Sequence, residues 1–172
     1  MAEGGYKIRD QKAIHFITFA VVEWIDVFTR KDYSEIVVNS LKFCQQNKAL
    51  QVHAWVIMSN HLHLILSAKE ESTLSDILRD FKKFTSSQIL KSIEKNERES
   101  RKKWMLWIFS SKAKINKRND KYQFRQQDNH AIECSTEEIL DSRMKYLHEN
   151  PLRAGLVRNE WEYTYSKRNW LL

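Results

Sequence analysis

The order of the predicted elements indicates an α+β domain with a mostly antiparallel sheet. Strand-like runs alternate with amphipathic helical stretches, two of the strands are separated by only two residues, and the 172 residues include just three glycines and one proline. We expect strand, helix, strand, strand, helix, and then a further strand and helix. That order is typical of the split βαβ, or ferredoxin-like, arrangement, with helices packed on one face of the sheet and the other face partly open for a ligand.

The strands are predicted from β-branched and aromatic runs. Residues 14–22, IHFITFAVV, form the first. The runs LQVHAWVIM (50–58) and HLHLIL (61–66) form two more, and only Ser59 and Asn60 separate them, which predicts a hairpin. The stretches WMLWIF (104–109) and YQFRQ (122–126) are expected to be strands or loop segments.

Three helices are predicted from their start signals and apolar stripes. Each begins at a capping residue with an acidic partner three positions on: Asp32 with Glu35, Thr73 with Asp76, and Ser135 with Glu138. The buried face of the second helix is expected to hold Leu74, Ile77, Leu78, Phe81, Phe84 and Ile89. The third should end near Glu149, because Pro151 cannot continue a helix.

Composition excludes several classes of protein. A chain with so few glycines has no glycine-rich phosphate loop, and its apolar runs are too short to cross a membrane. Two cysteines, Cys44 and Cys134, make neither a disulfide framework nor a cysteine zinc site. The polar amino terminus lacks the apolar centre of a signal peptide. We therefore expect a single domain over residues 1–172, reduced, cytoplasmic and not bound to a membrane.

The net charge of +7 is concentrated in one stretch. Residues 91–125 hold twelve Lys or Arg against four acidic residues, and the remainder is near neutral. Aromatic residues interleave with these cations: Trp104, Trp107, Phe109, Tyr122 and Phe124. Cations between aromatics suit a nucleic acid, whose phosphates attract the cations and whose bases stack on the rings. A solvated helix and loop is the alternative interpretation.

The stretch SNHLHLIL (59–66) places His61 and His63 on one face of a predicted strand, because alternate side chains of a strand share a face. Two imidazoles about 7 Å apart along a strand can converge on one divalent ion, although they need at least one more ligand. A structural histidine pair is the alternative, and for the other histidines, His15, His53, His130 and His148, a structural or exposed role is expected.

A second stretch, MKYLHENPLRAGLV (144–157), places Tyr146 and Asn150 four residues apart, on one side of the helix end. A tyrosine can attack a phosphodiester when a metal polarises the phosphate, and an amide oxygen can complete the ligand set. The alternative is that Tyr146 is simply a packing residue of an amphipathic helix.

WVIMSNHLHLIL together with YLHENPLRAGLV resembles the single-tyrosine HUH transposases (HUH denotes His-hydrophobic-His), in particular the REP-associated tyrosine transposase group. The resemblance runs from HFITFAV through YQFRQQDNHAIE to YTYSK. It implies that His61, His63 and Asn150 bind Mg²⁺ or Mn²⁺. It also implies that Tyr146 attacks single-stranded DNA near a hairpin, leaving a 5′-phosphotyrosine and a free 3′-hydroxyl.

The chain departs from the family pattern at Arg125, where an aromatic residue, typically Trp, is usual, and at Glu149, where Asn is more frequent. Phosphate contacts are expected from cations of the second helix and the basic stretch: Arg79, Lys82, Lys83, Lys112, Lys114, Lys117 and Arg118. A monomer and a homodimer both stay open. Two other functions are alternatives, a non-catalytic hairpin-binding protein of the same fold and an RNA-binding ferredoxin-like module.

Overall fold

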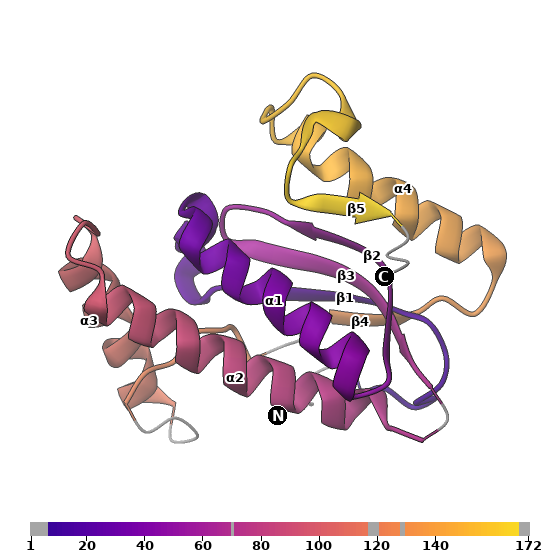
Figure 1. The fold of residues 1–172 in the computed structure, drawn as a ribbon, viewed down its shortest axis with the longest axis horizontal. Coiled ribbons are helices and arrows are strands. Elements are labelled where there is room, and N and C mark those ends of the chain that lie inside the picture. The colour runs from indigo at the N-terminus through magenta and orange to yellow at the C-terminus, as the bar shows by residue number, and fades with distance from the viewer. Residues whose placement is uncertain (1–6, 70, 117–120, 128–129, 169–172) are drawn as a thin grey trace.

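The computed structural model describes residues 7–69, 71–116, 121–127 and 130–168. Five strands form one sheet in the order β4-β1-β3-β2-β5, and each neighbouring pair is antiparallel (Figure 1). The strands are β1 (His15–Ala20), β2 (Leu50–Ile57), β3 (His61–Ala68), β4 (His130–Glu133) and β5 (Ser166–Arg168). The helices are α1 (Lys31–Asn47), α2 (Leu74–Lys95), α3 (Lys102–Ile115) and α4 (Glu137–Arg153).

The predicted α+β, ferredoxin-like arrangement is confirmed. The first predicted strand is β1, and the predicted hairpin is β2 and β3, joined at Ser59 and Asn60. The central pair, β1 and β3, is antiparallel with Thr18 opposite His63. This register matters for the site, because it brings a hydroxyl from one strand beside an imidazole of the other.

The two faces of the sheet are covered differently. Leu62, Leu64 and Leu66 of β3 are fully buried and pack with the apolar side chains of α1 and α2. Ile65, on the opposite face, packs instead with Leu147 of α4. The expectation of helices on one face therefore holds for α1 and α2, whereas α4 covers the face that also carries His61 and His63.

Residues 104–109 are helical, so the expectation of a strand or loop there is wrong. They lie within α3, where Met105, Phe109 and Ala113 are buried at a spacing of four, while Trp104 and Trp107 are exposed. That spacing is a helical stripe, which the dense apolar run concealed. Residues 122–126 contribute one isolated bridge, between Val21 and Arg125, and the fourth strand is β4.

Two helix ends also differ from the prediction. α4 continues through Pro151 to Arg153, because Pro151 lies in the last turn, where the helix loses only one backbone hydrogen bond, and its ring is buried. Of the predicted caps, Thr73 is confirmed, accepting from the Asp76 N–H, but α4 is capped by Thr136 in place of Ser135.

The remaining corrections concern α1 and the buried face of α2. α1 begins at Lys31 after Arg30, which makes no side-chain cap, so the box predicted from Asp32 does not form. Phe84 is 55% exposed, since its position on α2 lies beside the core stripe. Among the helices that the structure describes, none is long and apolar enough to cross a membrane.

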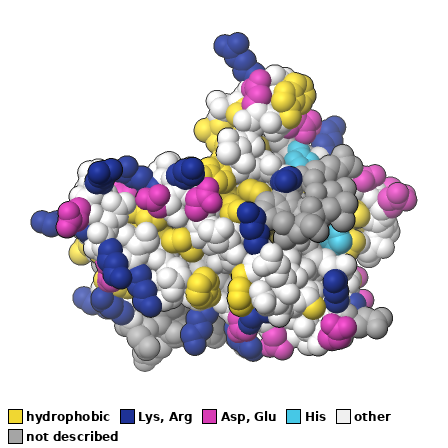
Figure 2. All heavy atoms as spheres, in the orientation of Figure 1, with side chains coloured by type: hydrophobic (Ala, Val, Ile, Leu, Met, Phe, Trp, Pro, Cys, Tyr) yellow, Lys and Arg dark blue, Asp and Glu magenta, His cyan; other side chains and the backbone are white. Residues whose placement is uncertain are grey.

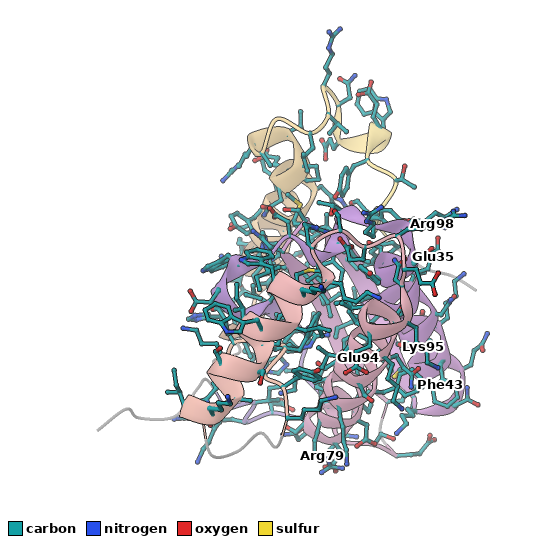
Figure 3. All side chains as sticks on the ribbon, turned by 90° about the vertical axis from the view of Figure 1, so that its left-hand side faces the viewer. Glu35, Phe43, Arg79, Glu94, Lys95 and Arg98 are labelled. Atoms are coloured by element: carbon teal, nitrogen blue, oxygen red, sulfur yellow. The ribbon has the colours of Figure 1, made fainter. Side chains whose placement is uncertain are left out.

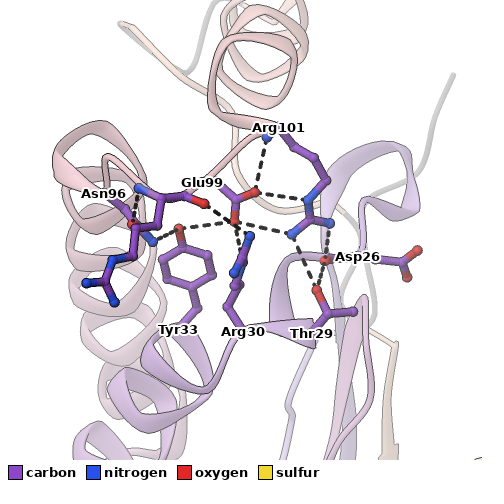
Figure 4. Close-up of polar contacts among 8 residues, drawn as sticks. Asp26, Thr29, Arg30, Tyr33, Asn96, Glu99 and Arg101 are labelled. Atoms are coloured by element: carbon purple, nitrogen blue, oxygen red, sulfur yellow. Dashed lines mark hydrogen bonds and ion pairs between the residues drawn. The ribbon is translucent and has the colours of Figure 1, made fainter.

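A buried carboxylate ties α1 to the turn between α2 and α3 (Figure 4). Glu99 is 3% exposed and accepts hydrogen bonds from Arg30 Nε and Arg101 Nε, each at 3.1 Å. Arg101 also donates to the carbonyl oxygen of Asp26, at 2.9 Å, and to the Thr29 hydroxyl. The cluster therefore holds residues 26–30, which lead into α1, against the α2–α3 turn.

Candidate active site

His61 and His63 converge, as the alternation of the strand predicts. Their Nε2 atoms are 3.1 Å apart and their ring centroids 4.7 Å. The other nitrogen of each ring has a polar partner. His61 Nδ1 is 2.7 Å from Asn60 Oδ1, and His63 Nδ1 is 2.8 Å from Thr18 Oγ1. Each ring is thus held at Nδ1, and both Nε2 atoms face the same point.

The hydrogen-bond network assigns the tautomer of His61. Because Asn60 Nδ2 donates to the Trp24 carbonyl oxygen, its Oδ1 is the acceptor for the His61 Nδ1 proton. The Thr18 hydroxyl can accept the Nδ1 proton of His63 in the same way. Both Nε2 lone pairs then point into the space between the rings, which is the orientation that second-shell partners impose on metal-binding histidines.

Burial keeps both imidazoles neutral at neutral pH. Burial lowers the pKa of His61. Burial, together with repulsion from His61 in its protonated form, lowers the pKa of His63 to about 3. Neutral imidazoles are the form that binds a cation. Two nitrogens bound at about 2.1 Å to one octahedral ion, 90° apart, would lie about 3.0 Å from each other. The 3.1 Å separation of the two Nε2 atoms fits a shared divalent ion.

Tyr146 of α4 lies on the same face of the sheet. Its ring centroid is 5.4 Å from that of His63 and 5.9 Å from that of Phe16, with edge-on geometry in both cases. The Arg153 guanidinium lies 5.5 Å from the centre of the Tyr146 ring. α4 is fixed there by Leu147, which is fully buried. One chain therefore supplies both histidines and the candidate nucleophile.

Asn150 lies one helical turn after Tyr146, and its side-chain Nδ2 donates to the Tyr146 carbonyl oxygen at 3.3 Å. Within the described residues, no hydrogen bond joins Asn150 to either histidine. The neighbouring carboxylate of Glu149 is occupied by Arg153, at 2.7 Å, and Lys145, at 3.7 Å. In the part of the chain that is described, no group of three or more His, Cys, Asp or Glu gathers, so a metal here depends on an amide ligand.

Sequence reasoning missed the two residues that orient the histidines. The sequence pattern predicts only a turn role for Asn60, although Asn60 directly precedes His61. Thr18 lies 45 positions from His63, and only the register of β1 against β3 brings the two together. Of the remaining histidines, His15 bonds to the Ala13 carbonyl oxygen and His53 to the Ser67 hydroxyl, in agreement with structural roles.

A basic groove of about 790 Å³ lies between α2 and residues 121–127. Its cationic lining residues are Lys82, Lys83, Lys91, Lys121 and Arg125. The one carboxylate of the lining, Glu94, is occupied by Lys121 and Tyr122, each at 2.9 Å. Figure 2 shows Lys and Arg side chains over the α2 and α3 side of the molecule.

Arg125 is the most unusual cation of this basic groove. Its guanidinium lies 5.1 Å from the centre of the Phe19 ring and donates to the Thr85 hydroxyl at 2.7 Å. Burial lowers the pKa of this guanidinium to about 9. Among the described residues, Arg125 forms no ion pair with a carboxylate. A cation thus stands where the family pattern predicts an aromatic residue.

The predicted phosphate contacts have unequal surroundings. Lys82 and Lys83 line the basic groove, and burial, with the charge of Arg125, lowers the pKa of Lys82. Arg79 points outward from α2 (Figure 3), but it is paired with Asp76 and Asp80.

The predicted cations near the end of α3 also differ. Lys112 is paired with Glu23, and Lys114 is exposed. Lys117 and Arg118 lie outside the described residues.

Residues 10–120 match the family model described as IS200-like transposase, which covers well over half of the chain. The chain belongs to the IS200-like transposase family. The matched residues of this transposase include both histidines and end before Tyr146. A search of curated proteins finds no match.

Two solved structures are similar to this chain, and the first of them shares its fold. A REP-associated tyrosine transposase bound to a REP hairpin matches with a TM-score of 0.68 and 13% identity, covering 96% of this chain and 82% of that one. A proposed transposase from Deinococcus radiodurans r1 matches with a TM-score of 0.47 and 13% identity, covering 87% and 97%. The first of these shows that the transposase described here shares the fold of a REP-associated enzyme.

Proposed function

We propose that this transposase cuts and rejoins single-stranded DNA beside a hairpin, with Tyr146 as the nucleophile. The observation that carries the proposal is the juxtaposition within one chain. The Tyr146 ring lies 5.4 Å from the His63 ring, and the two histidine Nε2 atoms converge at 3.1 Å. The DNA hairpin held by the similar REP-associated transposase supports the choice of substrate.

The proposed cleavage step exchanges one phosphoester bond for another. Tyr146 Oη attacks the phosphorus and forms a P–O bond, while the bond from phosphorus to the 3′-oxygen breaks. The tyrosine loses its proton and the departing 3′-oxygen gains one, leaving a 5′-phosphotyrosine and a free 3′-hydroxyl. Attack by a second DNA 3′-hydroxyl on the phosphotyrosine restores Tyr146 and joins the strands. The covalent link retains the phosphoester, so rejoining needs no further source of energy.

The chain's own residues would hold a divalent ion beside the scissile phosphate for this attack. His61 and His63 offer Nε2, and Asn150 offers Oδ1, since its Nδ2 already donates to the Tyr146 carbonyl. These three side chains would hold Mg²⁺ or Mn²⁺, which supplies charge stabilisation to the scissile phosphate when bound. Asn60 and Thr18 orient the two rings. Because one chain carries all of these groups, a monomer suffices for cleavage.

The DNA strand is proposed to continue over the basic groove. Lys82, Lys83 and Arg125 present positive charge there without a carboxylate of their own among the described residues. Such cations bind the backbone without regard to sequence. Arg79 and Lys112, being paired with acids, contribute less than Lys83 and Lys114.

The test is a covalent adduct assay. A labelled hairpin DNA with single-stranded flanks, taken from the neighbourhood of the gene, is incubated with the protein and Mg²⁺ or Mn²⁺, then separated on a denaturing gel. We expect a metal-dependent protein–DNA band that Tyr146→Phe abolishes. The matched control is Tyr163→Phe, which alters another half-buried tyrosine, whose hydroxyl bonds to the Ile57 carbonyl oxygen.

Each other outcome decides between the candidate functions. A band that survives Tyr146→Phe would assign the nucleophile to a different residue. Tight hairpin binding without any adduct, over several hairpins and both metals, would make the protein a non-catalytic hairpin binder. Equal affinity for RNA of the same sequence would favour the RNA-binding module.

A further inference from the structure

Trp24 is an exposed aromatic residue beside the candidate metal ligands. Its side chain belongs to the short helical turn after β1, Val22–Trp24, and is 53% exposed. Its ring centroid is 5.8 Å from that of His61, and the two ring planes meet at 81°. An edge-to-face pair covers less of an indole than a stacked pair does, so much of this ring stays open to solvent next to His61.

The backbone holds Trp24 in an unfavourable conformation. Glu23 and Trp24 have φ values of 53° and 52°, in the left-handed region that bulky residues seldom adopt. Two successive residues of this kind persist only where surrounding contacts enforce them, and such strain concentrates at ligand-binding sites. Val22 and Ile25, on either side of these two residues, are buried in the core, whereas the indole of Trp24 is 53% exposed.

Two contacts hold residues 23 and 24 in that conformation. Asn60, which orients His61, donates from Nδ2 to the Trp24 carbonyl oxygen at 3.2 Å. The Glu23 carboxylate is paired with Lys112 of α3. The Trp24 backbone and the candidate metal ligand His61 therefore share one hydrogen-bonding partner, Asn60. A group bound to His61 would have the indole as its neighbour.

We propose that Trp24 is a stacking platform for the DNA base next to the scissile phosphate. The proposal rests on the proposed function for the position of that phosphate, near His61 and His63. Single-stranded DNA is bound by cations that follow the backbone and by aromatic rings on which bases stack, because every base has a π-face. In this transposase, Trp24 provides the ring at the histidines, and the basic groove provides the cations.

The test is a binding cycle between Trp24 and single bases. Affinities are measured by fluorescence anisotropy for the hairpin DNA with single-stranded flanks, in the Tyr146→Phe background so that no strand is cut. A series of oligonucleotides lacks one base at a time through abasic substitution. We expect one position at which base removal weakens binding by between about fivefold and a hundredfold, the range for a stacked base. Trp24→Ala should weaken the binding of intact DNA by the same factor, and base removal at that position should then cause no further loss of affinity.

Two further variants separate stacking from a loss of structure. Trp24→Phe should restore part of the affinity and the sensitivity at the same position. Trp161→Ala, which removes an indole that is 80% exposed elsewhere, should change neither. The proposal is overturned when every abasic penalty is unchanged by Trp24→Ala, or when Trp161→Ala causes the same loss.

The outcomes also separate this proposal from the proposed function. A wild-type adduct without any coupling between Trp24 and a base would leave the cleavage chemistry in place and overturn the stacking platform. Coupling between Trp24 and a base, without a covalent adduct of the wild-type protein, would support the stacking platform and overturn the proposed cleavage. DNA that does not bind at all would overturn both.

Discussion

Replacing Glu99 by alanine should destabilise the protein by about 3 kcal/mol, because the carboxylate is the centre of a buried ionic cluster. The Glu99 side chain is fully buried and accepts hydrogen bonds from the side chains of Arg30, Arg101 and Tyr33 and from the Arg101 backbone N–H. Hydrogen bonds to a charged group contribute about 1.5–3 kcal/mol each, but members of one cluster do not add.

The partners of Glu99 set the size of the effect. Removing one member of a buried ion pair costs about 3–5 kcal/mol when the other charge stays buried. The Arg30 and Arg101 side chains are 42% and 31% exposed, so water can solvate them once the carboxylate is gone. The loss therefore falls at the lower end of that range.

The pH dependence gives an independent check. Burial acts to raise the pKa of Glu99, but hydrogen bonds from Arg101 and Arg30 outweigh it and lower the pKa. A carboxyl whose folded pKa is lowered contributes its stabilisation fully above its unfolded pKa, about 4.3, and loses it as the pH falls through the folded value. The difference between wild type and Glu99→Ala should therefore shrink below about pH 4.

The assay is urea unfolding followed by circular dichroism at neutral and acidic pH, with Glu97→Ala as the control. Glu97 is an exposed neighbour, and its replacement should change the free energy of unfolding by less than about 0.5 kcal/mol. Two results would refute the reasoning: a loss for Glu99→Ala below about 1 kcal/mol, or a loss that is independent of pH.

Three further predictions concern the candidate metal ligands, the basic groove and the backbone after α4. Thr18→Val removes the hydroxyl that orients His63 and should weaken Mn²⁺ binding, measured by calorimetry, by about 10- to 100-fold. Thr164→Val, at an exposed position, should not change the affinity, and equal affinities for the two variants would contradict a positioning role for Thr18. Lys83→Ala should reduce the slope of log affinity for single-stranded DNA against log salt concentration by about 0.7, the value for one phosphate contact. Arg79→Ala should leave this slope nearly unchanged, because Arg79 is already paired with Asp76 and Asp80, and the reverse order would place the DNA strand elsewhere. Gly155→Ala should lower the free energy of unfolding, measured in urea, by about 1 kcal/mol. The φ of Gly155 is +69°, and an added Cβ would meet no atom within 4 Å whose contact could offset the backbone strain. Unchanged stability would contradict the left-handed conformation.

Local patterns predicted the parts of the fold that depend on neighbouring residues. The alternation in HLHLIL placed His61 and His63 on one face and the leucines on the other, and all three leucines are fully buried. The spacing of Thr73 and Asp76 predicts the cap of α2, and the hydrogen bond from the Asp76 N–H to Thr73 Oγ1 confirms it. The same kind of pattern failed at α3, because an apolar run fits a strand and a helix equally well until its partners are known.

The sequence alone therefore predicted four candidate site residues and the elements that carry them: His61 and His63 on a strand, and Tyr146 and Asn150 on a helix. Only the tertiary structure decided that α4 packs on the histidine face, that Thr18 meets His63, and that Trp24 lies beside His61. The physical reason is that periodicity determines which way a side chain points within its own element. Distances between elements depend instead on sheet register and core packing, which are set by residues far apart along the chain.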